Sequence, residues 1–410
     1  MSSRLPDGWK HRCIGDVLTE HQDRCGDLEL EALSLTKGQG MVKASERFGR
    51  ALHGKDVSRY RHVRRGEVVL DPMLLWDGAI ARLWRFDEGF VSPDYRVYRP
   101  NAKIHHGFLD HLLDGHHMRL AYKNNARGTN KRRNRIARSD FLAIEFPSPP
   151  LPEQERIAAI LSSVDEAIQA TQAVIQQTRR VKEGLLQDLL TQGIGHTRFK
   201  KTEIGEIPAS WQVVALGQVA EVRSGVAKNS NKKLVDPIEV PYLRVANVQD
   251  GYLDLSEIRT ITIERARLEK YALKAGDVLM NEGGDIDKLG RGDVWQGQID
   301  PCVHQNHVFS VRCGAQLTPH YLSYLAESPF GKAYFLKKGK QTTNLASINK
   351  TQLRAFPVLL PPVGEQAEII KHLDAVRGVI DQGVVEVEQL QQVKAGLLQD
   401  LLTGTVRVSP

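Results

Sequence analysis

The sequence predicts a mixed α/β (α+β) protein that consists of a lobe, a long helix, a second lobe and a second long helix. Three observations lead to this prediction. An eight-residue sequence occurs twice, an apolar heptad pattern precedes each copy, and the regions between the copies alternate short apolar segments with glycine. The repeat reads Gly-Leu-Leu-Gln-Asp-Leu-Leu-Thr at residues 184–191 and again at 396–403. Its offset of 212 residues divides the chain of 410 residues into two similar halves.

The region before the first copy has the spacing of a long amphipathic helix. Ile157, Val164, Thr171, Thr178 and Leu185 recur every seven positions, which is a heptad pattern. Ile160, Ala167, Val174 and Val181 form the second heptad series, and Leu161, Ile168, Ile175 and Leu189 widen the stripe, as a helix in a bundle requires. Pro152 suits a first helical turn. A continuous helix from 153 to 191 would be about 58 Å long.

The second helix repeats this pattern in a weaker form, beginning near Pro362. Gly383 replaces Thr171, and His372 replaces Ile160, so we expect the second helix to be the less stable one. We also expect the two helices to pack antiparallel. The predicted packing residues of the second helix are Ile369, Leu373, Val376, Ile380, Val393, Leu397 and Leu401.

The two lobes also resemble each other. The first begins with Leu5, Pro6, Trp9, Ile14, Gly15 and Val17, and the second with Ile207, Pro208, Trp211, Leu216, Gly217 and Val219. Residues 66–69 align with 276–279, and residues 91–99 with 303–312 after one extra residue in the second lobe. Alternating apolar and β-branched segments between glycines predict short strands. We expect boundaries at 1–149 and 193–361 for the lobes, and at 150–192 and 362–410 for the helices.

The net charge differs between lobes and helices. Residues 1–149 carry 26 Lys and Arg against 19 Asp and Glu, a net charge of +7, and residues 193–361 carry 22 against 17, a net charge of +5. The two helical regions have net charges of −2 and −3. Basic lobes favour a polyanionic ligand, although an excess of this size also serves solubility.

Composition argues against a membrane or secreted protein. The apolar content of 41% is ordinary for a globular protein, and no run of about 18 apolar residues occurs. The first ten residues lack the design of a signal peptide. Four cysteines without a Cys-x-x-Cys pair indicate reduced thiols in a cytoplasmic protein.

Each lobe ends in a stretch that contains basic residues and no acidic ones. Such stretches suit phosphate contacts, although a solvated basic loop would look the same. The predicted phosphate-binding residues are Arg132, Arg133 and Arg135 in the first lobe and Lys337, Lys338 and Lys340 in the second.

Catalytic patterns are absent from the sequence. It contains no Gly-x-Gly-x-x-Gly, no phosphate loop ending in Gly-Lys-Ser/Thr, and no Asn/Asp-Pro-Pro-aromatic run of the kind that amino-methyltransferases use. We therefore expect no chemistry and no bound cofactor in this chain. Two groups have metal-ligand chemistry, Cys302 with His304, His307 and Cys313, and the histidines at 105, 106, 111, 116 and 117. Neither has the spacing of a common metal site, so we expect no metal.

With divergent lobes and near-identical helices, the chain resembles the specificity subunits of type I restriction-modification enzymes. The most specific marks are a Pro-Pro-x-x-Glu-Gln helix start, at Pro149, Pro150, Glu153 and Gln154 and at Pro361, Pro362, Glu365 and Gln366, and the Leu-Leu-Gln-Asp-Leu-Leu helix end. Residues 34–37, 71–73, 76–78 and 91–95 are similar to one class of target-recognition domain, and residues 241–248, 276–280 and 305–307 to another. Asp71 stands where this resemblance leads us to expect asparagine.

The resemblance implies two target-recognition domains that each read half of a split, asymmetric double-stranded DNA sequence. It also implies helices that separate these domains and dock two methyltransferase subunits, together with restriction subunits. S-adenosylmethionine, ATP and Mg²⁺ would then belong to those partners. A lobe–helix–lobe–helix tandem has a pseudo-two-fold axis, which suits half-sites about 34 Å apart.

The side chains with suitable chemistry for base edges are Ser34, Thr36 and Lys37 in the first lobe and Arg244, Asn247, Lys288 and Arg291 in the second. Each of them also suits a phosphate contact or a structural cap. Two other functions fit the sequence. One is a subunit of a related restriction enzyme in which one partner chain methylates and cleaves, and the other is a coiled-coil scaffold that binds nucleic acid without sequence preference.

Overall fold

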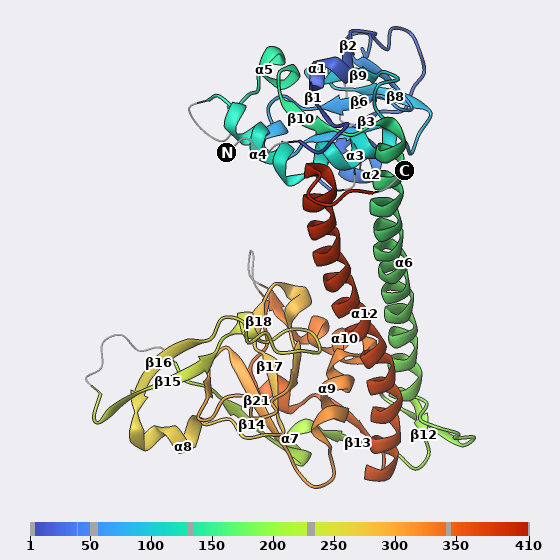
Figure 1. Ribbon diagram of the computed structural model, residues 1–410. Helices are drawn as coiled ribbons and strands as arrows, with labels where there is room; N and C mark the ends of the chain where they lie inside the picture. Colours follow the sequence, from blue (N-terminus) through green and yellow to red (C-terminus); the bar gives the residue numbers. More distant parts are fainter. Residues whose placement is uncertain are drawn as a thin grey trace. The chain divides into compact units, whose positions relative to one another are not determined.

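The computed structural model describes residues 5–38, 40–49, 56–128, 134–227, 234–341 and 346–408. Figure 1 shows two lobes of short strands and small helices, together with two long helices, α6 (Leu151–Leu189) and α12 (Val363–Thr403). The predicted mixed α and β fold class is therefore confirmed. Among the described residues, no helix has the length and apolar character needed to cross a membrane.

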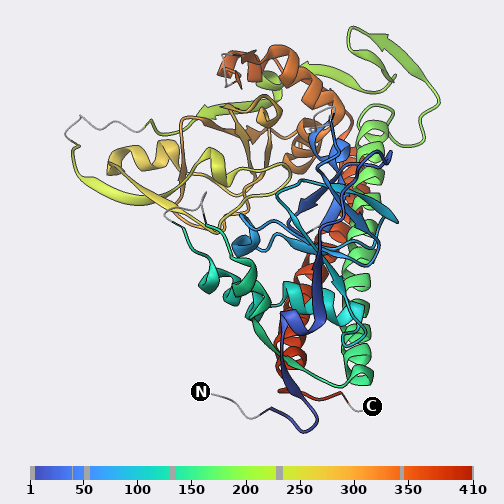
Figure 2. The same ribbon diagram turned by 90° about the horizontal axis from the view of Figure 1, so that it is seen from above.

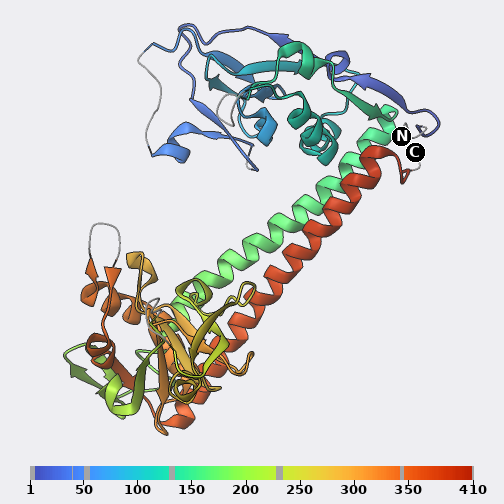
Figure 3. The ribbon, with the colours of Figure 1, turned by 90° about the vertical axis from the view of Figure 1, so that its left-hand side faces the viewer.

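The chain forms two compact units, and both long helices contribute to each. Unit 1 contains residues Met1–Gln172 and Val385–Pro410, and unit 2 contains Ala173–Val384. Each unit therefore combines one lobe with the first part of one long helix and the last part of the other. Figure 3 shows the start of α6, in green, beside the end of α12, in red, within unit 1. The two helix segments run antiparallel in both units.

The lobe of unit 1 is built around a four-stranded antiparallel sheet in the order β2-β9-β6-β7. Two-stranded pairs β1-β10, β3-β4 and β5-β8 surround this sheet. The elements are β1 (Lys10–Cys13), α1 (Ile14–Val17), β2 (Leu18–His21), β3 (Leu33–Thr36), β4 (Gly40–Lys43), α2 (Ala44–Phe48), β5 (Arg61–Arg64), β6 (Val68–Leu70), η1 (Leu75–Asp77), β7 (Ile80–Arg82), β8 (Glu88–Val91), β9 (Arg96–Pro100), α3 (His106–Asp114), α4 (His116–Asn125), α5 (Arg138–Leu142) and β10 (Glu145–Ser148).

The lobe of unit 2 has the same plan around the sheet β14-β21-β17-β19. Its elements are β11 (Phe199–Thr202), β12 (Gly205–Pro208), β13 (Gln212–Ala215), α7 (Leu216–Val219), β14 (Ala220–Ser224), β15 (Pro237–Leu243), η2 (Val245–Asn247), β16 (Arg259–Glu264), η3 (Arg265–Arg267), α8 (Leu268–Tyr271), β17 (Asp277–Asn281), β18 (Gly283–Gly284), η4 (Ile286–Lys288), β19 (Gly292–Val294), β20 (Val303–His304), β21 (Val308–Cys313), α9 (Pro319–Glu327), α10 (Pro329–Lys338), β22 (Lys340–Gln341), β23 (Ala346–Ser347), α11 (Lys350–Arg354) and β24 (Pro357–Leu360).

A buried carboxylate at the start of the central strand shows how closely the lobes agree. In unit 1, Glu67 accepts hydrogen bonds from Nε (3.1 Å) and Nη2 (2.8 Å) of Arg99. In unit 2, Asp277 accepts from Nε (2.7 Å) and Nη2 (2.8 Å) of Arg312 on the paired strand. Each carboxylate also accepts a backbone N–H three residues before it, from Arg64 and from Lys274. Buried carboxylates require such partners, and both lobes supply them at the same place.

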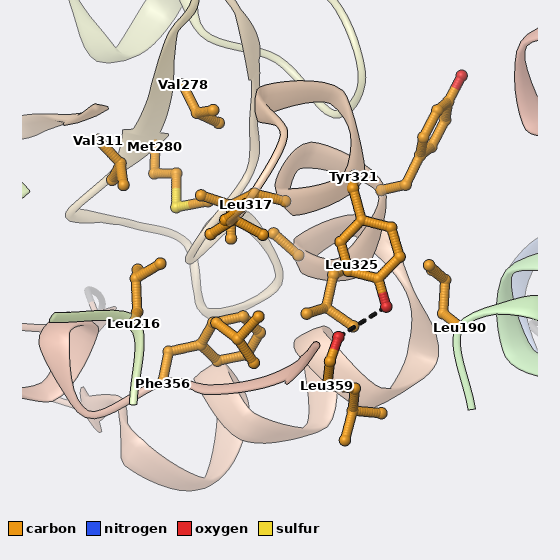
Figure 4. Close-up of a cluster of buried hydrophobic side chains, with 14 of the residues drawn as sticks. Leu190, Leu216, Val278, Met280, Val311, Leu317, Tyr321, Leu325, Phe356 and Leu359 are labelled. Atoms are coloured by element: carbon orange, nitrogen blue, oxygen red, sulfur yellow. Dashed lines mark hydrogen bonds between the residues drawn. The ribbon is translucent and has the colours of Figure 1, made fainter. Parts of the chain in front are cut away.

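Each lobe packs its apolar side chains against the long helices. Figure 4 shows part of the core of unit 2, where Leu190, just after α6, lies near Tyr321 and Leu359. The hydroxyl of Tyr321 donates to the carbonyl of Leu359 at 2.7 Å, so its polar end is satisfied in the core. Burying apolar side chains of this size contributes about 1.5–3 kcal/mol each, which ties the lobe to the helices.

The apolar side chains that α6 and α12 bury form a stripe, here called the helix seam. Its register along the helices differs in part from the predicted one. The predicted packing residues that are buried are Ile157, Leu161, Ile168, Ile369, Leu373 and Leu401, and those that are partly buried are Ile160, Val164, Leu185, Leu189, Val376, Ile380 and Leu397. Val181 and Val393 are 46% and 52% exposed, so of the two roles predicted for them, packing between the helices or against a partner, a partner remains the proposal. The buried residues include Leu161, Ile168 and Ile175, which lie four positions after Ile157, Val164 and Thr171. At the last two places the buried isoleucine is larger than the Ala167 or Val174 beside it, so it buries more apolar area.

The Glu-Gln pair at the start of each long helix fixes the lobe to that helix. Glu153 is 2% exposed and accepts from Trp9 Nε1 at 3.0 Å, and Glu365 accepts from Trp211 Nε1 at 3.0 Å. Each glutamate also binds a basic side chain that comes after the other long helix. Arg407 after α12 binds Glu153, and His196 after α6 binds Glu365. Figure 2 shows the end of α12 near the N-terminal strand β1 in unit 1.

Candidate nucleic-acid interface

The central strand of each lobe ends where several loops meet. In unit 2, β17 ends at Asn281, and the next residue, Glu282, is bonded to two other segments. Its N–H donates to the carbonyl of His307 at 3.0 Å, and its carbonyl accepts from Ile348 N at 2.8 Å. The loop before β21 and the segment containing β23 are therefore both held against the end of β17.

The loop after β17 is closed by backbone hydrogen bonds at its base. Asn281 N donates to the carbonyl of Arg291 at 2.9 Å, and Gly290 N donates to the carbonyl of Asn281 at 3.2 Å. Gly290 has a φ of 69°, and a Cβ there would lie 2.2 Å from the ring of Phe335 on α10. Only glycine allows this conformation and this close packing. The loop is thus fixed in shape before any ligand binds.

Basic side chains surround this strand end. Lys337 and Lys338 lie at the end of α10, Lys340 begins β22, and all three are exposed or partly exposed. Strand β22 pairs with β23, and β23 pairs with β18 in the loop after β17. Lys288, in the same loop, is 42% exposed and forms an ion pair with Asp285. The fold therefore gathers Lys288, Arg291 and the basic stretch around one edge of lobe 2, as phosphate binding requires.

The first lobe has the same arrangement at the end of β6. Asp71 follows β6, and its Oδ1 accepts from Met73 N at 2.9 Å. Ile136 N, in the basic stretch, donates to the carbonyl of Pro72 at 3.2 Å. Burial raises the pKa of Asp71 overall, against the backbone hydrogen bonds from Met73 and Leu74 and the charge of the exposed Arg135, which lower it. Arg132 and Arg133 lie outside the described residues.

The β3-β4 hairpin brings Lys37 to the same region of lobe 1. Lys37 is 59% exposed and forms an ion pair with Asp77 of η1 at 2.9 Å. Ser34 is 8% exposed and accepts a hydrogen bond from Arg47 at 2.8 Å, and Thr36 donates its hydroxyl hydrogen to the carbonyl of Gly40 at 2.8 Å. These bonds shape the hairpin that carries Lys37, and the DNA contacts of Ser34 and Thr36 stay predictions.

Two further residues that were predicted to contact DNA, Arg244 and Asn247, make hydrogen bonds within lobe 2. Asn247 is 3% exposed, its Oδ1 accepts from Arg244 N at 2.9 Å, and its Nδ2 donates to the carbonyls of Asp254 (2.9 Å) and Glu257 (3.0 Å). These bonds use both hydrogens of the amide within the lobe. The Arg244 side chain is 18% exposed and bonds to the carbonyl of Glu257 at 3.2 Å, so it closes the same loop. Both side chains cap this loop, and their contacts with base edges stay predictions.

Among the described residues, no group of three or more His, Cys, Asp or Glu side chains is placed to hold a metal ion. Cys302 and His304 are buried in unit 2, where His304 Nδ1 faces the carbonyl of Val308 at 2.7 Å. Burial lowers the pKa of His304 to about 4, so its imidazole is neutral and serves as a core hydrogen-bond donor. His307 belongs to the exposed edge instead.

One pair at this edge was not predicted from the sequence. His307 is 57% exposed, and its Nδ1 lies 3.0 Å from Oε2 of Glu282. The sequence contained a signal for the pair. Residues 305–307 resemble one class of target-recognition domain, and residues 276–279 align with residues 66–69 of the first lobe. The end of β17 and the loop before β21 could therefore have been considered together.

Comparisons with known proteins agree with this arrangement. Residues 75–179 and 208–387 match the family model of the type I restriction modification DNA specificity domain. The chain is 28% identical over 368 residues to the MjaVIII specificity subunit of Methanocaldococcus jannaschii, covering 86% of this chain and 83% of that subunit. It is 26% identical over 326 residues to the EcoKI specificity subunit of Escherichia coli strain K12, covering 76% of this chain and 67% of that protein.

Two solved structures share the fold. One, from work on the complex assembly and conformational transition of the type I R-M system, has a TM-score of 0.61 at 19% identity and covers 98% of this chain and 100% of its own. The S subunit from M. genitalium has a TM-score of 0.54 at 13% identity and covers 98% of each chain. The family match spans well over half of the chain. The protein therefore belongs to the type I restriction-modification DNA specificity family, and it is a non-catalytic, DNA-recognising specificity subunit.

Proposed function

We propose that this subunit reads a bipartite, asymmetric sequence in double-stranded DNA, with residues 1–149 reading one half and residues 193–361 the other. The observation that carries the proposal is the similarity between the two lobes at the ends of their central strands, β6 and β17. Glu67–Arg99 and Asp277–Arg312 fix the same framework in both lobes, while the exposed residues beside the strand ends differ. One framework with two sets of surface residues suits two different half-sites.

The two long helices, in residues 150–192 and 362–410, separate the half-sites and dock two methyltransferase subunits, with restriction subunits joining the complex. Support comes from apolar side chains that the helix seam leaves exposed. Val174 and Val181 on α6 are 57% and 46% exposed, and Val379 and Val393 on α12 are 51% and 52% exposed. Exposed apolar residues on a regular element favour a protein partner.

The chemistry of the complex belongs to these partners. S-adenosylmethionine, ATP and Mg²⁺ bind to the methyltransferase and restriction subunits, and the complex works in the cytoplasm, where the host DNA lies. The specificity subunit supplies phosphate contacts from Lys337, Lys338, Lys340, Lys288 and Arg135, together with contacts to base edges.

The test is to purify the complex from its host through a tag on this chain and to select DNA from a random library. The expected result is enrichment of two different half-sites with a constant gap, matched by the methylated sites in the host genome. Enrichment of no sequence would support a non-specific scaffold instead. Copurification of a single chain that both methylates and cleaves would indicate the related two-part enzyme.

A further inference from the structure

Glu282 and His307 form a pair at the DNA-facing edge proposed for lobe 2. Glu282 follows the central strand β17, and His307 precedes β21, so two neighbouring strands deliver them to one place. The backbone joins them as well, since Glu282 N donates to the carbonyl of His307 at 3.0 Å. Neither residue depends on a flexible segment for its position relative to the other.

The contacts of His307 define which ring nitrogen carries its hydrogen. Nδ1 lies 3.0 Å from a carboxylate oxygen of Glu282, so Nδ1–H is the donor of this bond. On the other side of the ring, Nε2 lies 3.4 Å from the amide Nδ2 of Asn306, a long contact that a closer donor can replace. With its hydrogen on Nδ1, the ring presents Nε2 as an acceptor, and the side chain is 57% exposed.

The surroundings of this acceptor suit DNA. Glu282 is followed by Gly283 and Gly284, which pair with β23, and β23 pairs with β22, where Lys340 lies. Glycines allow a backbone or a base to approach closely, and cations nearby bind phosphates. In the major groove, the donors that can meet an acceptor are the amino groups N6 of adenine and N4 of cytosine.

We propose that His307 is a specificity-determining residue of lobe 2, which accepts a hydrogen bond at Nε2 from the exocyclic amino group of adenine or cytosine, and that Glu282 positions it. This inference rests on the function proposed above. Glu282 acts through the imidazole, because its carboxylate holds the Nδ1–H tautomer and fixes the ring plane.

The equivalent place in lobe 1 carries different chemistry, as two different half-sites require. The alignment of residues 66–69 with 276–279 puts Pro72 at the position of Glu282, and the strand pairing puts Asp94 at the position of His307. Lobe 1 therefore has a proline and a carboxylate where lobe 2 has a carboxylate and an imidazole.

The experiment uses the complex purified through this chain and selects DNA from a random library. Removing the side chain in His307→Ala should lower the preference at one base pair of one half-site about 10-fold. The other half-site and the salt dependence should stay unchanged. Glu282→Ala should relax the same base pair, and the double variant should relax it no further than His307→Ala alone. Glu282→Gln keeps an acceptor for Nδ1–H and should retain the preference.

His320→Ala is the matched control, because His320 lies in the same lobe at the start of α9 and bonds only weakly to Gln296, at 3.4 Å. A uniform loss of binding at all positions in His307→Ala would mean a structural role and overturn the inference. An unchanged base preference would overturn it too, while leaving the proposed function intact. A wild-type complex that selects no sequence would overturn the proposed function itself.

Discussion

Arg407 and Glu153 lie 254 residues apart in the sequence and are joined by two hydrogen bonds, from Nε at 2.7 Å and from Nη2 at 2.9 Å. The guanidinium also lies 5.9 Å from the ring of Trp9. In unit 2, His196 takes the corresponding place, with Nε2 at 2.7 Å from Glu365. The segment after α12 therefore completes the structure at the start of α6, and the segment after α6 does the same for α12.

Replacing Arg407 by alanine should weaken unit 1. Glu153 is 2% exposed, and the change would remove the guanidinium that balances its buried charge, leaving the hydrogen bond from Trp9 Nε1. Thermal unfolding should occur at a lower temperature than in the wild type. Adding Glu153→Gln to Arg407→Ala should recover part of the loss, because the buried charge is then absent. Arg179→Ala, on an exposed position of α6, is the control. A double variant that is no more stable than Arg407→Ala would argue against a buried-charge effect.

The two framework ion pairs should respond differently to loss of arginine. Asp277 is 1% exposed, and Arg312→Ala removes both of its guanidinium bonds, so we expect a loss of about 3 kcal/mol of unfolding free energy. Each carboxylate keeps its backbone N–H, from Lys274 or from Arg64, but Glu67 also has His21 Nε2 at 3.2 Å, so Arg99→Ala should lose only about 1 kcal/mol. Urea unfolding of the two variants measures this difference. Equal losses would mean that the neighbours of Glu67 do not compensate.

Neutralising the basic edge of lobe 2 should weaken binding to all DNA sequences alike. Lys337, Lys338 and Lys340 reach solvent, and replacing all three by alanine should reduce the slope of log K against log salt by up to about 3. The order of preferred sequences should not change. Asn247→Ala is a useful contrast, because this buried cap should affect stability and leave the salt slope alone. An unchanged slope in the triple variant would place these lysines away from the phosphates.

The long helices should set the gap between the half-sites. Four extra residues within 168–178 of α6 add about 6 Å and rotate the remainder of the helix by about 40°. The apolar seam largely survives this rotation, and the preferred gap should widen by one or two base pairs, since each rises about 3.4 Å. Sequencing of methylated sites in cells with each variant and its partners measures the gap.

A two-residue insertion at the same place is the matched control. Its rotation of about 200° turns the apolar seam toward solvent, so it should cost folding or partner docking and leave no active complex with a shifted gap. If the four-residue variant keeps the original gap, or alters the bases that are read, the helices are not the spacer.

Much of the fold could be predicted from the sequence because the two halves of the chain repeat each other and can be aligned. The repeat at 184–191 and 396–403, with proline before each helix, predicts α6 and α12 within a residue or two of their ends. The aligned segments at 66–69 and 276–279 prove to be the starts of the central strands β6 and β17. Two copies of one pattern restrict the interpretation far more than one copy does.

The register of the helix seam and the roles of polar side chains were harder to predict. Residues three and four positions along a helix lie near the same face, so Val174 and Ile175 were both compatible with the seam, and only Ile175 is buried. Asn247 has the same amide whether it caps a loop or reads adenine, and its bonds to the carbonyls of Asp254 and Glu257 appear only in the structure. Such partners depend on tertiary structure, which composition and spacing do not contain.

The division of the two units along the chain has a consequence for protein synthesis. Unit 2 is one continuous segment, so all of its residues are synthesised before the last segment of unit 1, Val385–Pro410. Unit 1 must wait, because Leu401 and Leu402 belong to the same core as Trp9 and Ile14. The lobe that is translated first is therefore completed last, and until then its apolar surface is open to chaperones and proteases.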